Sequence, residues 1–228
     1  YLSHNIGGFK IRDFDVSYDE LEVDPWPFAS SSIANRLTQL SNALLMEQAA
    51  TILCARGGYG ASDLLQDIDW QALAKIKNKT VVGFSHISAL HAAFYTHLYK
   101  PEHGLRLIHG PMPSTRLWNF EIKEVETLLY SLKYPAAQNI SLKLAAVNGL
   151  ARAKKTKGKL FGGCFSVLTN LIGTPHLPQL DGHLLFFEDI GEHPARLMEI
   201  FKPMDSIWAF ARCKRSNSRL FQRYGRWN

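Results

Sequence analysis

The sequence predicts an α/β fold in which a parallel sheet is flanked by helices. Short apolar runs at 51–55, 80–83 and 105–108 each end in a turn that contains Gly or His. Segments with apolar residues at helical spacing alternate with these runs. Strands that alternate with helices are typical of a parallel sheet covered on both faces, and such sheets place their sites at the carboxyl ends of the strands.

The helices are predicted from the spacing of apolar residues. An amphipathic helix is expected over 33–50 after three serines that can cap it, and a short helical stretch is expected over 61–66. Apolar residues recur at helical spacing from Ile87 to Leu98, and again over 119–132. These helices supply the layers that cover the expected sheet.

We expect two domains joined by a crossover. Residues 1–133 form the larger α/β domain, 134–159 form a linker with a basic loop, and 160–228 form a smaller C-terminal α/β domain. In the smaller domain, a strand over 183–189 carries four consecutive apolar residues, which is typical of a strand buried on both faces. A helix from 194 to 201 follows it.

Charge and composition exclude several classes of protein. The net charge is +6, but residues 211–228 hold six basic and no acidic side chains, so the rest of the chain is neutral overall and nucleic acid is not favoured as a partner. No run approaches the roughly 18 apolar residues of a membrane span, and the first residues have no basic region that leads into an apolar one. The sequence therefore predicts a cytoplasmic protein with no membrane partner.

Cysteine and histidine usage does not favour a metal site. The three cysteines are far apart, which indicates reduced thiols, and no spacing typical of metal ligands occurs. The glycine-rich segment 56–60 lacks the spacing of a P-loop or a dinucleotide fingerprint. We therefore expect neither a metal nor a nucleotide cofactor.

Ser85 is the first candidate for chemistry. It follows the strand 80–83 and precedes a helix, so its hydroxyl projects at the carboxyl end of a strand beside the N–H groups of the first helical turn. The pattern is Gly-x-Ser-x-x and lacks the last glycine of the best-known nucleophile elbow. Taken alone, the stretch favours the alternative that Ser85 only caps the helix.

Further candidates lie at the ends of other strands. Gly57, Gly58 and Gly60 let backbone N–H groups approach a ligand, although a plain strand-to-helix turn would use glycine as well. His109 ends the strand at 105–108. Glu188 lies at the carboxyl end of the strand predicted over 183–189, where a carboxylate can either cap the next helix or orient a catalytic histidine.

These motifs in this order resemble the LD-carboxypeptidase family of serine peptidases, which includes muramoyltetrapeptide carboxypeptidases and microcin-immunity peptidases. The segments that carry the resemblance run from Gly8 to about Phe201 and are Arg56-Gly57-Gly58-Tyr59-Gly60, Gly83-Phe84-Ser85, His109-Gly110-Pro111-Met112, Gly162-Gly163, Gly173-Thr174-Pro175 and Leu185-Phe186-Phe187-Glu188-Asp189. The resemblance reverses the local preference and favours Ser85 as a nucleophile.

The resemblance implies roles for individual residues. Ser85 matches the nucleophile, and Glu188 matches the acidic residue that orients the catalytic histidine. Backbone N–H groups of Gly57, Gly58 and His86 match the oxyanion hole, and the substrate-binding positions are Arg56, Tyr59 and His109. The family releases the terminal D-amino acid from an L,D bond of cytoplasmic murein peptides during peptidoglycan recycling, without a metal or nucleotide.

The chain departs from the family pattern at two places. His86 stands where the family usually has Asp, and no histidine follows His193, although the family takes its catalytic histidine from beyond that point. We expect a truncated C-terminal domain with an atypical tail from about Lys214, caused by a change of reading frame; a native basic arm is the alternative. His91 lies about 9 Å along the helix from Ser85, which makes it a poor substitute base, and His109 is a better candidate.

The sequence therefore favours an LD-carboxypeptidase with little or no turnover. The alternatives are a catalytically inactive peptide-binding pseudoenzyme and a microcin-immunity type of peptidase. A nucleic-acid-binding module is disfavoured because the basic tail lacks interleaved aromatic residues on a regular element. The sequence does not fix the oligomeric state, and a homodimer is one option.

Overall fold

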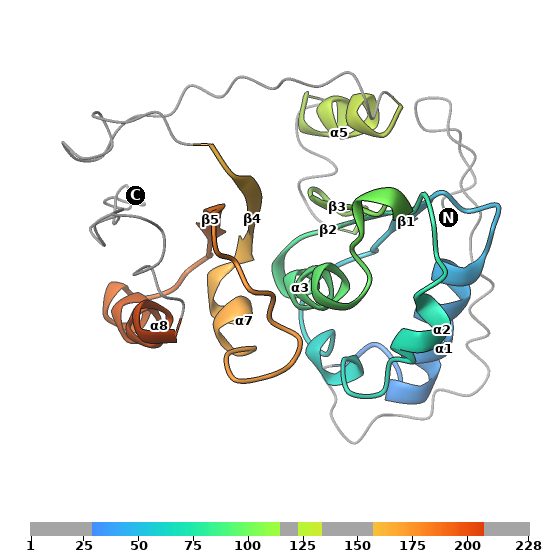
Figure 1. Ribbon diagram of the computed structural model, residues 1–228. Helices are drawn as coiled ribbons and strands as arrows, with labels where there is room; N and C mark the ends of the chain where they lie inside the picture. The colour runs from blue at the N-terminus through green and yellow to red at the C-terminus, as the bar shows by residue number, and fades with distance from the viewer. Residues whose placement is uncertain (1–28, 115–122, 134–156, 208–228) are drawn as a thin grey trace.

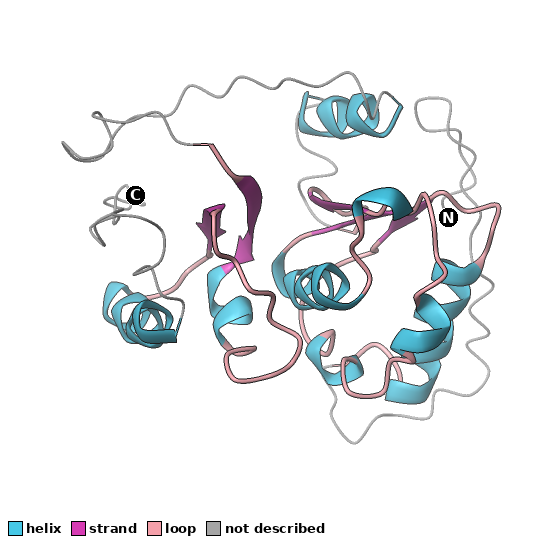
Figure 2. Cartoon of the chain, viewed as in Figure 1, coloured by secondary structure: helices cyan, strands magenta, loops and turns pink. Residues whose placement is uncertain are grey.

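The computed structural model describes residues 29–114, 123–133 and 157–207, and these form two parallel sheets with helices around them (Figures 1 and 2). The larger sheet contains β1 (Thr51–Leu53), β2 (Thr80–Gly83) and β3 (Arg106–His109) in the order β1-β2-β3. The smaller sheet pairs β4 (Lys159–Cys164) with β5 (His183–Glu188). The predicted α/β class with a parallel sheet is confirmed.

Helices surround the larger sheet. Figure 1 shows α3 and α5 on opposite sides of its strands. The described helices, including the short 3₁₀ turns labelled η, are α1 (Ile33–Leu45), η2 (Ser62–Leu64), α2 (Trp70–Leu73), η3 (Ser85–Ile87), α3 (Ser88–His97), η4 (Pro101–His103), α5 (Lys123–Lys133), α7 (Phe165–Thr169) and α8 (Pro194–Ile207).

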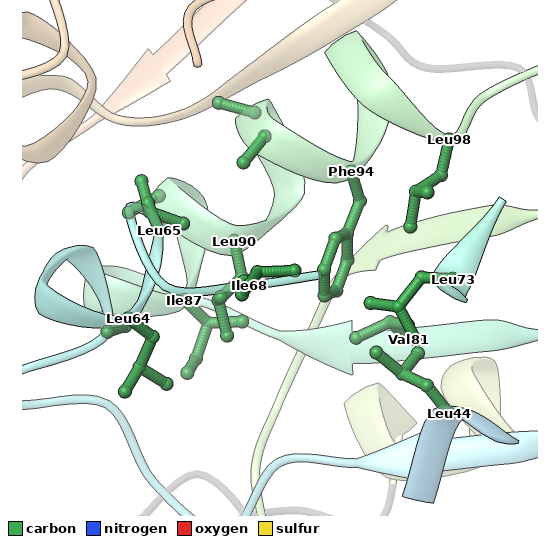
Figure 3. Close-up of a cluster of buried hydrophobic side chains, with 14 of the residues drawn as sticks. Leu44, Leu64, Leu65, Ile68, Leu73, Val81, Ile87, Leu90, Phe94 and Leu98 are labelled. Atoms are coloured by element: carbon green, nitrogen blue, oxygen red, sulfur yellow. The ribbon is translucent and has the colours of Figure 1, made fainter. Parts of the chain in front are cut away.

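The main hydrophobic core forms around α3. Phe94 has no exposed surface and lies among side chains from α1, α2 and β2, including Leu44, Leu73 and Val81 (Figure 3). The same cluster continues into the smaller sheet through Phe161. Because α3 is buried along most of its length, the strand β2 and the turn that precedes α3 are held rigidly in the core.

Several predicted elements differ from the structure in their bounds. The first helix ends at Leu45 instead of residue 50, because Met46 is extended and the Lys79 ammonium group binds the carbonyl oxygens of Met46 and Ala49. The helical stretch predicted over 61–66 is a single 3₁₀ turn at η2. The helix after residue 194 extends beyond residue 201 to Ile207.

The prediction that the strand over 183–189 is buried on both faces was wrong. All six residues of β5 are half-buried. In the described part of the chain β5 pairs only with β4, so the small sheet covers less of each strand than a wide parallel sheet does. Most of the linker predicted over 134–159 and the tail from Lys214 lie outside the described residues, and so does Cys213.

Candidate active site

Ser85 occupies a strained turn between β2 and α3. Its backbone φ is +58°, in the left-handed region that costs a non-glycine residue about 1–2 kcal/mol. The turn is tight because a Cβ atom at Gly83 would lie 2.8 Å from the Ile87 side chain. Neither η3 nor α3 has a side-chain cap, so the alternative that Ser85 caps the helix is not found. The local geometry is that of a nucleophile elbow.

The glycine loop after β1 lies directly against Ser85. A Cβ atom at Gly57 would be 2.9 Å from Ser85 Cβ and 3.1 Å from Ser85 Oγ, so only glycine fits at this distance. Gly58 and Gly60 have φ values of +108° and +93°, which other residues rarely adopt. The loop therefore brings main chain to the serine hydroxyl, which a plain strand-to-helix turn does not require.

The loop and the elbow line a cavity of about 300 Å³. Its lining residues are Arg56, Gly57, Gly58, Phe84, Ser85, Met112 and Ser114. Among the described residues, no backbone hydrogen bond outside the helices and strands uses the N–H group of Gly57 or Gly58. Of the predicted site residues, the structure thus brings Ser85, both loop glycines and Arg56 into one cavity.

Arg56 supplies a positive charge to this cavity. Its side chain is exposed, and its guanidinium group folds back toward Gly58, where a Cβ atom would lie 3.7 Å from Nη2. Tyr59 is 55% exposed and does not line the cavity; its ring lies 5.8 Å from that of His86. A guanidinium group in the cavity that contains the serine is suited to bind a carboxylate.

His109 and Glu188 meet beside the cavity, at the carboxyl ends of β3 and β5. His109 Nε2 is 3.3 Å from Glu188 Oε1, and both side chains are partly exposed. The His109 ring makes edge contacts with the rings of Phe84 and Phe186, at 6.1 and 5.4 Å between centroids. Neither His109 nor Glu188 lines the cavity that contains Ser85.

Two polar residues to which the sequence analysis gave no role fix the main chain near this pair. Ser88 Oγ, fully buried on α3, accepts a hydrogen bond of 2.9 Å from the Cys164 N–H at the end of β4. Asp189 accepts hydrogen bonds from the N–H groups of Ser166 and Ile190, at 2.9 and 3.0 Å, and so fixes the start of α7 next to Glu188. A buried Ser three residues after the elbow is the one signal that could have identified Ser88.

His91 is not placed to act on Ser85. It is 4% exposed on α3, and burial, with a contribution from the nearby His109, lowers its pKa to about 4. Its Nε2 atom is buried without a hydrogen-bond partner. His91 is therefore a neutral core residue, and it does not line the cavity.

Among the residues that the structure describes, no group of three His, Cys, Asp or Glu side chains could hold a metal ion. No helix there is long and apolar enough to cross a membrane. Cys54 and Cys164 are free thiols, and burial raises the pKa of Cys54 to about 12.

Comparison with known proteins identifies the class to which this fold and cavity belong. Residues 3–110 match the LD-carboxypeptidase N-terminal domain, and residues 157–214 match the LD-carboxypeptidase C-terminal domain. The chain belongs to the LD-carboxypeptidase family.

Individual relatives agree with this assignment. The chain is 35% identical over 177 residues to a Streptomyces coelicolor protein described as a carboxypeptidase, covering 76% of this chain and 54% of the relative. It is 32% identical over 191 residues to the murein tetrapeptide carboxypeptidase of Pseudomonas aeruginosa, covering 79% and 59%. The microcin C7 self immunity protein MccF has the same fold, with a TM-score of 0.64 at 20% identity over 85% of this chain and 64% of that protein. The chain spans between half and three fifths of the length of the two carboxypeptidases.

Proposed function

We propose that this chain carries the nucleophile of a serine LD-carboxypeptidase that releases the terminal D-amino acid from an L,D bond of murein peptides, in cytoplasmic recycling of peptidoglycan. The single observation that supports this most is the strained Ser85 elbow in an open cavity, where Gly57 lies so close that a Cβ atom on it would be 3.1 Å from Ser85 Oγ. The name of the Pseudomonas aeruginosa relative supports the choice of substrate.

In this proposal each residue of the cavity has its own role in peptide hydrolysis. Ser85 Oγ attacks the carbonyl carbon of the terminal peptide bond, and the N–H groups of Gly57, Gly58 and His86 stabilise the negative charge that develops on its oxygen. Arg56 binds the terminal carboxylate, which restricts cleavage to the last residue of the peptide. Tyr59 and His109 lie at the margins and contact the rest of the substrate.

The described residues do not place a general base next to Ser85. None of the histidines in the described part of the chain hydrogen-bonds to Ser85, and Glu188 faces His109 instead of a histidine in the cavity. Loss of one triad member lowers the rate of a serine hydrolase by ~10⁴ to 10⁶. We therefore propose that the chain as given binds substrate but turns it over slowly.

Two alternatives follow from particular observations. None of the described residues that line the cavity is a histidine, which favours a catalytically inactive protein that retains a peptide-binding cleft. The fold shared with the microcin C7 self immunity protein favours a peptidase that acts on a peptide-nucleotide antibiotic. Both alternatives retain the cavity and its guanidinium group, so binding and cleavage must be measured separately.

The test uses the whole chain with a murein tetrapeptide that ends in D-alanine. Calorimetry measures binding, and release of D-alanine is followed for the wild type, Ser85→Ala and the matched control Ser114→Ala, which changes a serine of the same cavity. We expect micromolar to millimolar binding and slow release that Ser85→Ala abolishes and Ser114→Ala retains. Binding without release would favour the inactive protein, whereas release at the rate of an intact triad would overturn the proposed impairment. Cleavage of a peptidyl nucleotide alone would favour the microcin type, and absence of all binding would overturn the proposal.

A further inference from the structure

The side chain of His86 does not line the cavity, and it binds the end of the glycine loop. The Ala61 N–H donates a hydrogen bond of 3.1 Å to His86 Nδ1. A ring nitrogen that accepts a hydrogen bond carries no proton, so the neutral ring has its proton on Nε2. Because His86 directly follows Ser85, this bond connects the elbow to the loop that lies against the serine hydroxyl.

A second residue holds the same peptide group from its other side. Arg36, on α1, donates a hydrogen bond of 2.6 Å from Nη1 to the Gly60 carbonyl oxygen. The Gly60 oxygen and the Ala61 N–H belong to one planar, trans peptide unit and point in opposite directions. Arg36 and His86 together therefore fix the orientation of this peptide plane, and with it the end of the glycine loop.

The surroundings of His86 favour its neutral form. Burial lowers the pKa of His86 most, the Asp63 carboxylate on η2 raises it, and the Arg36 guanidinium lowers it again. Tyr59, in the loop, is a further titratable residue beside His86, with ring centroids 5.8 Å apart. Near pH 7 the ring is thus able to accept from Ala61, and it loses this ability when Nδ1 is protonated in mild acid.

We propose that His86 is a positioning residue whose neutral ring holds the Gly60–Ala61 peptide, and that protonation of His86 releases the glycine loop from the elbow. Its importance for catalysis rests on the proposed function, since the loop matters there as the oxyanion site. The hydrogen bond itself does not depend on that function. Loop position and nucleophile position are then coupled through one titratable side chain.

The experiment follows two sites of the whole chain by nuclear magnetic resonance. The ¹⁵N shifts of the His86 ring report its tautomer and its titration, and hydrogen exchange reports the protection of the Ala61 amide. We expect the Nε2–H tautomer at pH 7, and a protection factor that falls by about tenfold as the ring is protonated at a pH below 6.5. Constant protection through the titration of His86 would overturn the inference.

Two variants separate the hydrogen bond from a general effect on folding. In His86→Asn the amide oxygen replaces Nδ1 as an acceptor that does not titrate, so we expect Ala61 to stay protected throughout the same pH range. In His86→Ala the acceptor is lost, and protection should be low at every pH. Equal protection of the Ala61 amide in His86→Ala and the wild type at pH 7 would contradict the proposal. If His86→Ala does not fold, the comparison of the wild type with His86→Asn across the pH range still tests it.

The labelling of Ser85 by a fluorophosphonate is measured in parallel, as a test of the nucleophile. If Ala61 follows the titration of His86 but Ser85 is never labelled, the positioning role stands and the proposed function fails. If Ser85 is labelled but the protection of Ala61 does not follow the titration of His86, the proposed function stands and the positioning role fails.

Discussion

Glu188 and His109 face each other across the two sheets of the protein, with Oε1 and Nε2 3.3 Å apart. The two side chains come from the carboxyl ends of β5 and β3, which lie in different sheets. Phe84, which lines the cavity, also contacts the His109 ring. The pair therefore connects the smaller sheet to the wall of the cavity that contains Ser85.

This contact should appear as a measurable coupling between the two residues. In a double-mutant cycle with His109→Ala and Glu188→Ala, we expect a coupling free energy of about 0.5–1 kcal/mol, because the pair is partly exposed and screened by water. Urea unfolding of the four proteins at one pH gives the value. Strictly additive effects of the two substitutions would contradict a direct contact.

The positive φ of Ser85 predicts an unusual order of stabilities. Glycine adopts this backbone conformation without strain, so Ser85→Gly should be more stable than Ser85→Ala by about 1 kcal/mol. Ser114 lines the same cavity without a positive φ, and there glycine should be no more stable than alanine. Thermal and urea unfolding compare the two pairs, and the same order at both positions would argue against strain at the elbow.

The close approach of Gly57 to Ser85 predicts that even a methyl group is not accepted. In Gly57→Ala the added Cβ would lie 2.9 Å from Ser85 Cβ, so we expect a loss of about 1–3 kcal/mol in unfolding free energy and weaker binding of the tetrapeptide. The control is Gly110→Ala, at the end of another strand, where the nearest atom would be 3.4 Å away. If both variants were equally stable, the main chain of the loop could not lie as close to Ser85 as the structure has it.

Stability should decrease as the pH falls from about 7 to about 4. Burial lowers the pKa of four histidines, His86, His91, His97 and His176. The pKa of His91 is about 4 in the folded protein and 6.5 in the unfolded chain. Between these values the unfolded state binds more protons than the folded state, so it becomes relatively more stable as the pH falls. His91 alone should remove about 2–3 kcal/mol of unfolding free energy by pH 4.5.

Urea unfolding at several pH values measures this slope. His91→Phe replaces the ring by one that cannot be protonated, and it should reduce the slope whatever it does to the stability at pH 7. His97 Nε2 and His176 Nδ1 are 3.1 Å apart, so protonation of both rings adds repulsion in the same range. A slope that is unchanged in His91→Phe would contradict the assignment of His91 as a neutral core residue.

Much of the larger sheet could be predicted because its signals are local. The apolar run that ends at Gly83, and the spacing through Leu90 and Phe94, identified β2 and α3 as neighbours in the chain. The bounds were less certain where a distant residue decides them. The first helix ends at Leu45 because Lys79, thirty or more residues away, binds the Met46 and Ala49 carbonyl oxygens of the segment that follows it.

The sequence by itself determined the order of strands and helices, the position of Ser85 after a strand and the glycines beside it, because these depend on side-chain size and periodicity within short segments. Only the tertiary structure decided that Glu188 faces His109, and that the His86 ring turns to Ala61. Such contacts join residues 25 to 79 positions apart, and the packing of the core, not local spacing, sets the distances between them.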